Sequence, residues 1–230
     1  MTIAIMQPYF LPYIGYFQLI NAVDKFIFYD DVNFIKNGWI NRNRILINGE
    51  AKYITIQLKE ASSFKQIKEI EFTDNRRKIL RSIEQAYAKA PYAKSIMPLI
   101  NSILTFDSNH ISNLAINSVK SICNYLEINT TFELSSLDYK STKTLERTER
   151  IKELCKLNNA DTYINVIGGQ ELYAKQDFAT ENITLKFLKS NSVTYKQLNE
   201  EYIPWLSIVD VLMFNSKEDI SNMLNDFYYE

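Results

Sequence analysis

MQPYFLPYIGYFQLI, residues 6–20, decides the fold prediction because it lies between two segments that have the composition of β-strands. An apolar run at residues 2–6 leads into it. KFIFY at residues 25–29 follows it with the aromatic and β-branched residues that favour strands. Pro12 suits the first residue of a helix, because that position needs no backbone N–H. A strand, a helix and a strand joined by short connections predict a βαβ unit and hence a parallel sheet.

The rest of the chain continues this alternation around one hairpin and one helical segment. Asn48-Gly49 is the dipeptide most typical of a tight hairpin, so strands are expected on both sides of it, at 44–47 and 52–58. Further strands are expected at 131–134, 162–165 and 183–188, and helices at 144–157, 206–214 and 219–228. We predict one α/β domain over residues 1–230, with a mostly parallel Rossmann-like sheet, a β-hairpin and an added helical block at about 74–128.

The expected helix boundaries rest on individual residues. Asp74 is the predicted N-cap of the first helix in the block, and Asp107 or Ser108 is the predicted cap of the third. His110, the only histidine, lies at that helix start, so we interpret it as a surface or capping residue. Leu145 is expected to face the core from the helix at 144–157.

Composition argues against several classes of function. The chain has 26 Lys and Arg against 27 Asp and Glu, a balance that does not predict a nucleic-acid partner. No window reaches the ~18 apolar residues of a membrane span, and Pro8 interrupts the first apolar stretch where a signal peptide would need continuity. Cys123 and Cys155 lie in apolar patterns, which predicts buried free thiols and not a zinc site. We therefore expect a cytoplasmic protein.

The first candidate site is the connection after the first strand. Ligands of open α/β sheets bind at the carboxyl ends of the strands, and a helix start there favours anions such as phosphate. Tyrosines in this segment offer hydroxyl groups and stacking faces, and glycine permits a close approach of backbone or ligand. The alternative is an aromatic corner that only fills the core. The candidates for ligand contact are Gln7, Tyr9, Pro12, Gly15 and Tyr16, with Tyr13 as a candidate catalytic hydroxyl.

The second candidate site follows the second strand. Asp30 and Asp31 come at its end, where a carboxylate can orient a ribose, hold a metal ion or assist proton transfer; we predict Asp30 as catalytic. Cations, amides and one indole follow, a combination that suits a sugar nucleotide. Its predicted binding residues are Lys36, Trp39, Arg42 and Asn43, and Arg44 belongs to the same run. The alternative is a solvated loop whose charges form surface pairs.

A third candidate site follows the strand at 162–165. Asn165 ends that strand, and Gly168-Gly169 can free backbone N–H groups for an anion, although such a turn is usually only a connection. Arg150 is expected to pair at the surface with Glu146 or Glu149, or to reach the crevice. Asp210 stands alone in the apolar run LSIVDVLMF. It is interpreted either as a buried hydrogen-bond acceptor or as a functional acid.

Five blocks of the chain together resemble the WbqC-like family of bacterial proteins, which is associated with O-antigen and other surface-polysaccharide gene clusters. The blocks are MQPYFLPYIGYFQLI, the segment DKFIFYDDVNFIKNGWINRN, TERIKELC, ADTYINVIGGQELY and PWLSIVDVLMFN. Within the first block, P-Y-I-G-Y also resembles loosely the first turn of HIGH-type nucleotidyltransferases, but both histidines of that motif are absent. The family resemblance implies a pathway more firmly than a reaction.

The resemblance and the residues together give the functional expectation. The enzyme reading is transfer of an acyl or aminoacyl group to the amine of a nucleotide-activated amino sugar. ATP, an acyl donor and a divalent metal are the candidate cofactors, and no metal ligands are assigned. The alternative is a non-catalytic protein that binds a sugar nucleotide or serves as a scaffold in polysaccharide assembly. A third, weaker option is a glycosyltransferase that uses Asp30-Asp31 to hold a metal.

Overall fold

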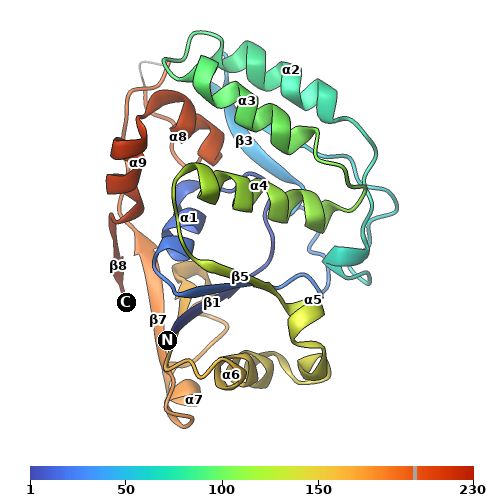
Figure 1. The fold of residues 1–230 in the computed structure, drawn as a ribbon, viewed down its shortest axis with the longest axis vertical. Helices are drawn as coiled ribbons and strands as arrows, with labels where there is room; N and C mark the ends of the chain where they lie inside the picture. Colours follow the sequence, from blue (N-terminus) through green and yellow to red (C-terminus); the bar gives the residue numbers. More distant parts are fainter. Residues whose placement is uncertain (199–200) are drawn as a thin grey trace.

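The computed structural model describes residues 1–198 and 201–230, and within them six strands form one mixed sheet (Figure 1). Their order across the sheet is β5-β2-β1-β6-β7-β8. Adjacent strands run parallel except for β8, which is antiparallel to β7. The bounds are β1 Thr2–Met6, β2 Lys25–Phe28, β5 Thr131–Leu134, β6 Thr162–Val166, β7 Thr184–Ser190 and β8 Phe227–Tyr229. The predicted mostly parallel α/β sheet is confirmed.

The strand order locates the ligand-binding edge. From β1 the chain builds outward through β2 to β5, and it then returns to the other side of β1 to form β6 and β7. The order therefore reverses between β1 and β6. In open α/β sheets, ligands bind in the crevice outside the carboxyl ends of the strands at such a reversal. The connection after β1, residues 7–13, lies at this place.

Helices cover both faces of the sheet because alternate residues of its strands point to opposite sides (Figure 1). Ala4 of β1 packs into the core that contains α1 (Ile14–Asn21). Its neighbours Ile3 and Ile5 pack into the opposite core with α6 (Arg147–Leu157) and α7 (Lys175–Ala179). The short α5 (Ser135–Asp138) follows β5.

The hairpin lies outside the main sheet and was predicted correctly. Strands β3 (Arg42–Ile47) and β4 (Glu50–Thr55) pair antiparallel around Asn48 and Gly49, whose φ angles are 51° and 78°. Positive φ at both turn positions is the conformation that Asn-Gly adopts readily, and its twist matches that of the two strands.

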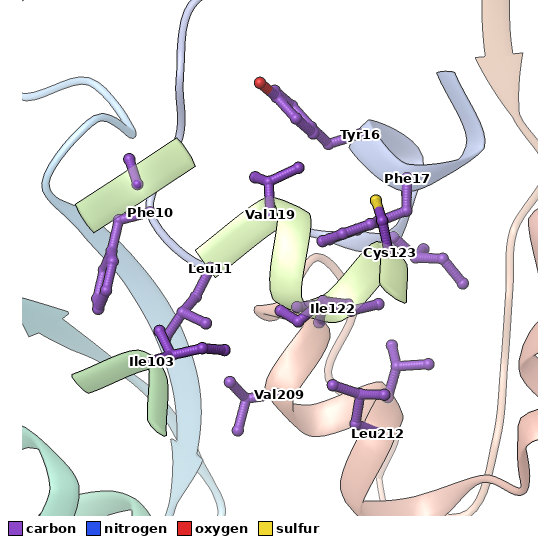
Figure 2. Close-up of a cluster of buried hydrophobic side chains, with 14 of the residues drawn as sticks. Phe10, Leu11, Tyr16, Phe17, Ile103, Val119, Ile122, Cys123, Val209 and Leu212 are labelled. Carbon is purple, nitrogen blue, oxygen red and sulfur yellow. The ribbon is translucent and has the colours of Figure 1, made fainter. Parts of the chain in front are cut away.

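The helical block extends one core well beyond the sheet. It comprises α2 (Arg76–Tyr87), α3 (Ala93–Leu104) and α4 (Ile111–Tyr125), and it packs against α8 (Ile208–Phe214) and α9 (Lys217–Leu224). Figure 2 shows how the connection after β1 enters this core: Leu11 lies beside Ile103, with Val119 of α4 and Val209 of α8 around it. The site-bearing loop is thus anchored by fully buried apolar side chains.

Several predicted boundaries need correction. Helix α1 begins at Ile14 and not at Pro12, because Tyr13 is still extended, with ψ of 168°. The C-terminal helix ends at Leu224, and residues expected to continue it form β8. Asn75 and His110, not Asp74, Asp107 or Ser108, occupy the N-cap positions of α2 and α4. Leu145 was predicted to face the core from the helix at 144–157. It is exposed, because α6 begins only at Arg147 and Leu145 lies before it.

The two thiols are buried and free, as the sequence predicts. Burial raises the pKa of the Cys155 thiol to about 12 and raises that of Cys123 further, so both stay protonated.

In the part of the chain that the structure describes, no helix is both long and apolar enough to cross a membrane.

Candidate functional site

A pocket of about 330 Å³ opens where the connections after three strands meet. The loop at 7–13 comes from β1, the β3–β4 hairpin follows β2, and the segment before α8 follows β7. This volume falls within the range of small-molecule sites. Its lining residues are Tyr9, Pro12, Tyr13, Trp39, Asn43, Arg44 and Trp205.

The loop at 7–13 is held in a strained shape by hydrogen bonds from elsewhere in the chain. Leu11 has φ of 45°, a conformation unfavourable for a non-glycine residue. Its N–H donates to Ser118 Oγ at 3.2 Å, and its carbonyl accepts from Ser207 Oγ at 2.7 Å. On either side, Phe10 N–H donates to the Trp39 carbonyl, and the Pro12 carbonyl accepts from the backbone N–H of residue 208. The surroundings therefore fix the pocket wall before any ligand arrives.

Asn43 lines the pocket but acts mainly as a positioning residue. Its Nδ2 donates to the carbonyls of Leu11 at 2.8 Å and Phe10 at 3.4 Å, and its Oδ1 accepts from Arg44 N–H at 2.8 Å. These bonds use most of what the buried amide can offer. Asn43 thereby ties the hairpin to the strained loop.

Arg44 provides the positive charge of the pocket. Its Nη2 donates to the Trp205 carbonyl at 3.2 Å, and its Cζ lies 5.9 Å from the Trp39 ring centroid. Its Nε is buried and has no hydrogen-bond partner among the described residues. The Nε lies out of reach of the pocket, so a phosphate there would accept hydrogen bonds from the Nη groups of this guanidinium.

The aromatic walls are neutral at physiological pH. Burial raises the pKa of Tyr9, and the proximity of Tyr13 raises it further. Burial also raises the pKa of Tyr13, although a hydrogen bond with Ser190 acts to lower it. Tyr13 and Trp205 meet edge to face, with ring centroids 5.9 Å apart. These hydroxyls therefore act as hydrogen-bond donors and not as bases, and the rings offer faces for stacking.

Asp30 lies outside the pocket lining and is already fully engaged. It is buried, and its carboxylate accepts from Ser135 Oγ, from Ser136 N–H at 3.0 Å and from Ser136 Oγ at 2.7 Å. These bonds fix the start of α5. Its catalytic role stays a prediction.

Asp31 and Arg150 form a buried ion pair beneath this edge of the sheet. Arg150 Nη2 lies 2.7 Å from Asp31 Oδ2, and its Cζ lies 4.7 Å from the Tyr29 ring centroid. The surface pairing expected for Arg150 with Glu146 or Glu149 is wrong, because its side chain points inward. Glu149 pairs with Lys152 instead.

Several other predicted residues, four of them near the loop and the hairpin, do not line the pocket. Arg42 donates to the carbonyls of Asn37 and Gly38 and thus fixes the turn that presents Trp39. Tyr16 is buried and donates to the Gln7 carbonyl at 2.9 Å, so both residues shape the start of the loop. Lys36 is exposed.

Gly15 makes room for a side chain of the site. A Cβ at Gly15 would lie 2.4 Å from the Tyr13 ring, so this glycine lets the ring fold over the first turn of α1. At the end of β6, Gly169 does the same for the buried Asn165 amide, at 2.4 Å. Gly168 faces open space. Neither Asn165 nor the two glycines line the pocket.

Sequence reasoning missed one pocket residue and undervalued another. Trp205 is not among the predicted site residues. Its backbone φ of 60° places the exposed indole at the pocket, and the sequence carries no signal for this conformation. Arg44 was predicted only as a neighbour of Arg42. Strand periodicity puts both on one face and cannot tell which of them lines the pocket.

Residues 1–198 and 201–230 contain no cluster of three or more His, Cys, Asp or Glu that could hold a metal ion.

Fold and site together define an α/β protein with an aromatic, cationic pocket at the carboxyl edge of its sheet. The chain belongs to the WbqC-like protein family, whose model matches residues 7–222. It is 32% identical over 218 residues to the uncharacterized protein Rv1507c of Mycobacterium tuberculosis, a match that covers 93% of each chain. No solved structure matches the chain significantly.

Proposed function

We propose that this protein binds a nucleotide-activated amino sugar and acts in the synthesis of a surface polysaccharide. One observation carries the proposal: the guanidinium of Arg44 lies in a pocket whose lining contains four aromatic rings. An arginine fork suits a phosphate, and aromatic faces suit the flat base or the apolar face of a sugar. The polysaccharide context is the general association of the family.

The reaction that we propose is transfer of an acyl or aminoacyl group to the sugar amine. The amine nitrogen bonds to the acyl carbon, the bond from that carbon to the leaving group of the donor breaks, and the proton lost by the nitrogen passes to the departing group or to water. Tyr13, kept neutral by burial, would donate a hydrogen bond to the acyl oxygen as negative charge develops there. The donor is either a preformed acyl donor or an acyl-adenylate made from ATP.

A non-catalytic binding role is the second candidate, and the lining itself favours it. Among the described residues that line the pocket there is no carboxylate, histidine, cysteine or lysine. A binding protein needs none of these groups, whereas acyl transfer usually uses one as a base. The two candidates share the ligand and differ in turnover.

Calorimetric titration with UDP-glucosamine tests the shared ligand. Arg44→Ala should weaken binding by roughly 10- to 100-fold, because a hydrogen bond to a charged group contributes about 1.5–3 kcal/mol. Arg81→Ala, which removes an exposed arginine from α2, is the matched control and should leave affinity unchanged. Equal losses in the two variants, or no binding by the wild type, would contradict the proposal.

Turnover separates the enzyme from the binding protein. The wild type is incubated with UDP-glucosamine and either an acetyl or glycyl thioester or ATP plus the free acid, and the amide product is followed by mass spectrometry. Amide formation that Tyr13→Phe slows without a matching loss of affinity supports the enzyme. Binding without product in every mixture favours the second candidate.

A further inference from the structure

A second, smaller cavity of about 40 Å³ lies directly behind the pocket. The two share Tyr13 and Trp205 as a common wall. A single water needs roughly 10–15 Å³ of such space, so this cavity holds a group of a few atoms and excludes a sugar ring. Because the two cavities are neighbours, a ligand that spans both would place only a small substituent in this one.

Aromatic rings surround this cavity on several sides. Tyr195 and Tyr202 meet edge to face with centroids 5.3 Å apart, and Tyr13 and Trp205 form the second such pair at 5.9 Å. Ring faces attract cations through their quadrupole, most strongly where water is excluded. The lining thus has the composition of a cage for a small cation.

A buried carboxylate stands behind the cage. Asp210 is fully buried and accepts hydrogen bonds from Tyr195 Oη at 2.7 Å, Gln197 Nε2 at 2.8 Å and Tyr87 Oη at 2.8 Å. All three partners are neutral, and within the described residues no cation pairs with it. Tyr195 donates its hydroxyl hydrogen to Asp210, so the negative charge of this carboxylate lies one hydrogen bond away from a ring of the cavity lining.

The two cavities have opposite electrostatic character. Arg44 lines only the larger pocket, whereas the described lining of the smaller one contains no lysine or arginine that would repel a cation. Ser190 and Asn191 add neutral polar groups there. A ligand with a phosphate at one end and a cation at the other matches this arrangement.

We propose that the smaller cavity is an ammonium cage, in which Tyr195, Tyr202 and Trp205 receive the protonated amine of a ligand whose phosphate lies near Arg44. This assignment rests on the proposed function for the identity of the ligand, the amino sugar, and it describes the bound state of the binding role, since an ammonium must leave the cage and lose its proton before it can accept an acyl group. It adds that the protein selects the amine itself: an N-acylated or hydroxyl sugar at that position would leave the cage without its cation.

Paired titrations with UDP-glucosamine and UDP-glucose test the cage, since the two differ only in amine against hydroxyl. At about pH 6, where the amine is protonated, UDP-glucosamine should bind the wild type at least about 10-fold more tightly. Tyr195→Leu, which removes the ring and its hydrogen bond to Asp210, should abolish that preference while UDP-glucose affinity stays the same. Tyr87→Phe, which removes a bond to the same carboxylate from outside the cavity, is the matched control and should keep the preference.

Equal affinity of the wild type for both ligands overturns the cage and leaves the sugar-nucleotide site intact. If neither ligand binds, the proposed function fails and methylammonium becomes the probe of the cage alone. Saturable NMR shifts of the Trp205 indole on adding methylammonium, lost in Tyr202→Ala, then support the cage, and their absence overturns it. Tyr202→Ala also serves if Tyr195→Leu fails to fold, because Tyr202 is only partly buried.

Discussion

At the scale of single residues, the strained backbone positions Leu11 and Trp205 both lie at the pocket. Their φ angles of 45° and 60° are unfavourable for bulky side chains, and such strain persists only where neighbours impose it. At Leu11 the neighbours are Asn43, Ser118 and Ser207. A site with this much backbone fixed in advance loses little conformational entropy when it binds a ligand.

The adjacent glycines after β6 allow a matched prediction. Gly169→Ala should lower the free energy of unfolding by about 1–3 kcal/mol, because its Cβ would overlap the buried Asn165 amide. Gly168→Ala meets nothing within 4 Å and should stay within about 0.5 kcal/mol of the wild type. Urea denaturation of both variants measures the difference. Equal stabilities would mean that Asn165 moves aside freely.

The sequence located the candidate pocket better than it identified the side chains that line it. Tyr9, Tyr13 and Trp39 were chosen for their position after strands, and they line the pocket. Arg42 was preferred to Arg44, yet carbonyls of the preceding turn occupy Arg42. That outcome depends on how a turn folds back on its own strand, which residue spacing does not encode.

At the scale of elements, the last strand completes the sheet and also fixes α1. Phe187 and Glu230 exchange backbone hydrogen bonds at 3.1 and 2.9 Å. Gln18 of α1 is buried and donates to the carbonyls of Met223 and Asp226 at 2.8 and 3.1 Å. The chain end therefore satisfies polar groups of the helix that follows the site loop.

Deletion of residues 226–230 should destabilise the protein by at least about 2–3 kcal/mol, since the β7–β8 ladder and the backbone hydrogen bonds that flank it at Phe187 and Asn191 are lost. The melting temperature should fall by roughly 4–12 °C for a chain of this size. Tyr228→Ala, which keeps the backbone and truncates an exposed side chain, is the control and should change little. Calorimetry compares the three proteins; an unchanged melting temperature for the deletion would show that β8 adds nothing to stability.

Elements with a local cause were predictable, and those with a distant cause were not. The Asn-Gly turn carries its own conformational preference, and β5 was placed at its observed residues from its pattern alone. Strand β8 forms because the edge of β7 is available to pair, a fact about the assembled sheet. The start of α1 is likewise delayed to Ile14 by the hydrogen bond that the Pro12 carbonyl accepts from α8.

At the scale of the whole molecule, two carboxyl groups, the partly exposed Glu133 and the buried Asp210, make the stability depend on pH in opposite ways. Burial acts to raise the pKa of Glu133, but hydrogen bonds from Lys25 and Tyr139 outweigh it and bring the pKa below the ordinary 4.5. Its contribution is present above that value and is lost as pH falls. For Asp210, burial outweighs the hydrogen bonds from Tyr195, Tyr87 and Gln197 and raises the pKa above 3.8. The native state then binds the extra proton, so stability falls as pH rises above 3.8.

Two isosteric variants should therefore diverge with pH. Relative to the wild type, Asp210→Asn should gain unfolding free energy between about pH 4 and pH 7, because it removes an anion that the fold has desolvated without a cation. Glu133→Gln should lose unfolding free energy over the same interval, since it removes an anion that Lys25 holds at 2.7 Å. Urea denaturation at several pH values measures how the free energy of unfolding of each variant, relative to the wild type, changes with pH. The comparison holds even if a variant is more or less stable than the wild type at every pH. Parallel pH profiles for the two variants would refute the opposite roles. The same measurement also tests the cage. If methylammonium removes the decrease of unfolding free energy with pH that is assigned to Asp210, a cation binds close to that carboxylate.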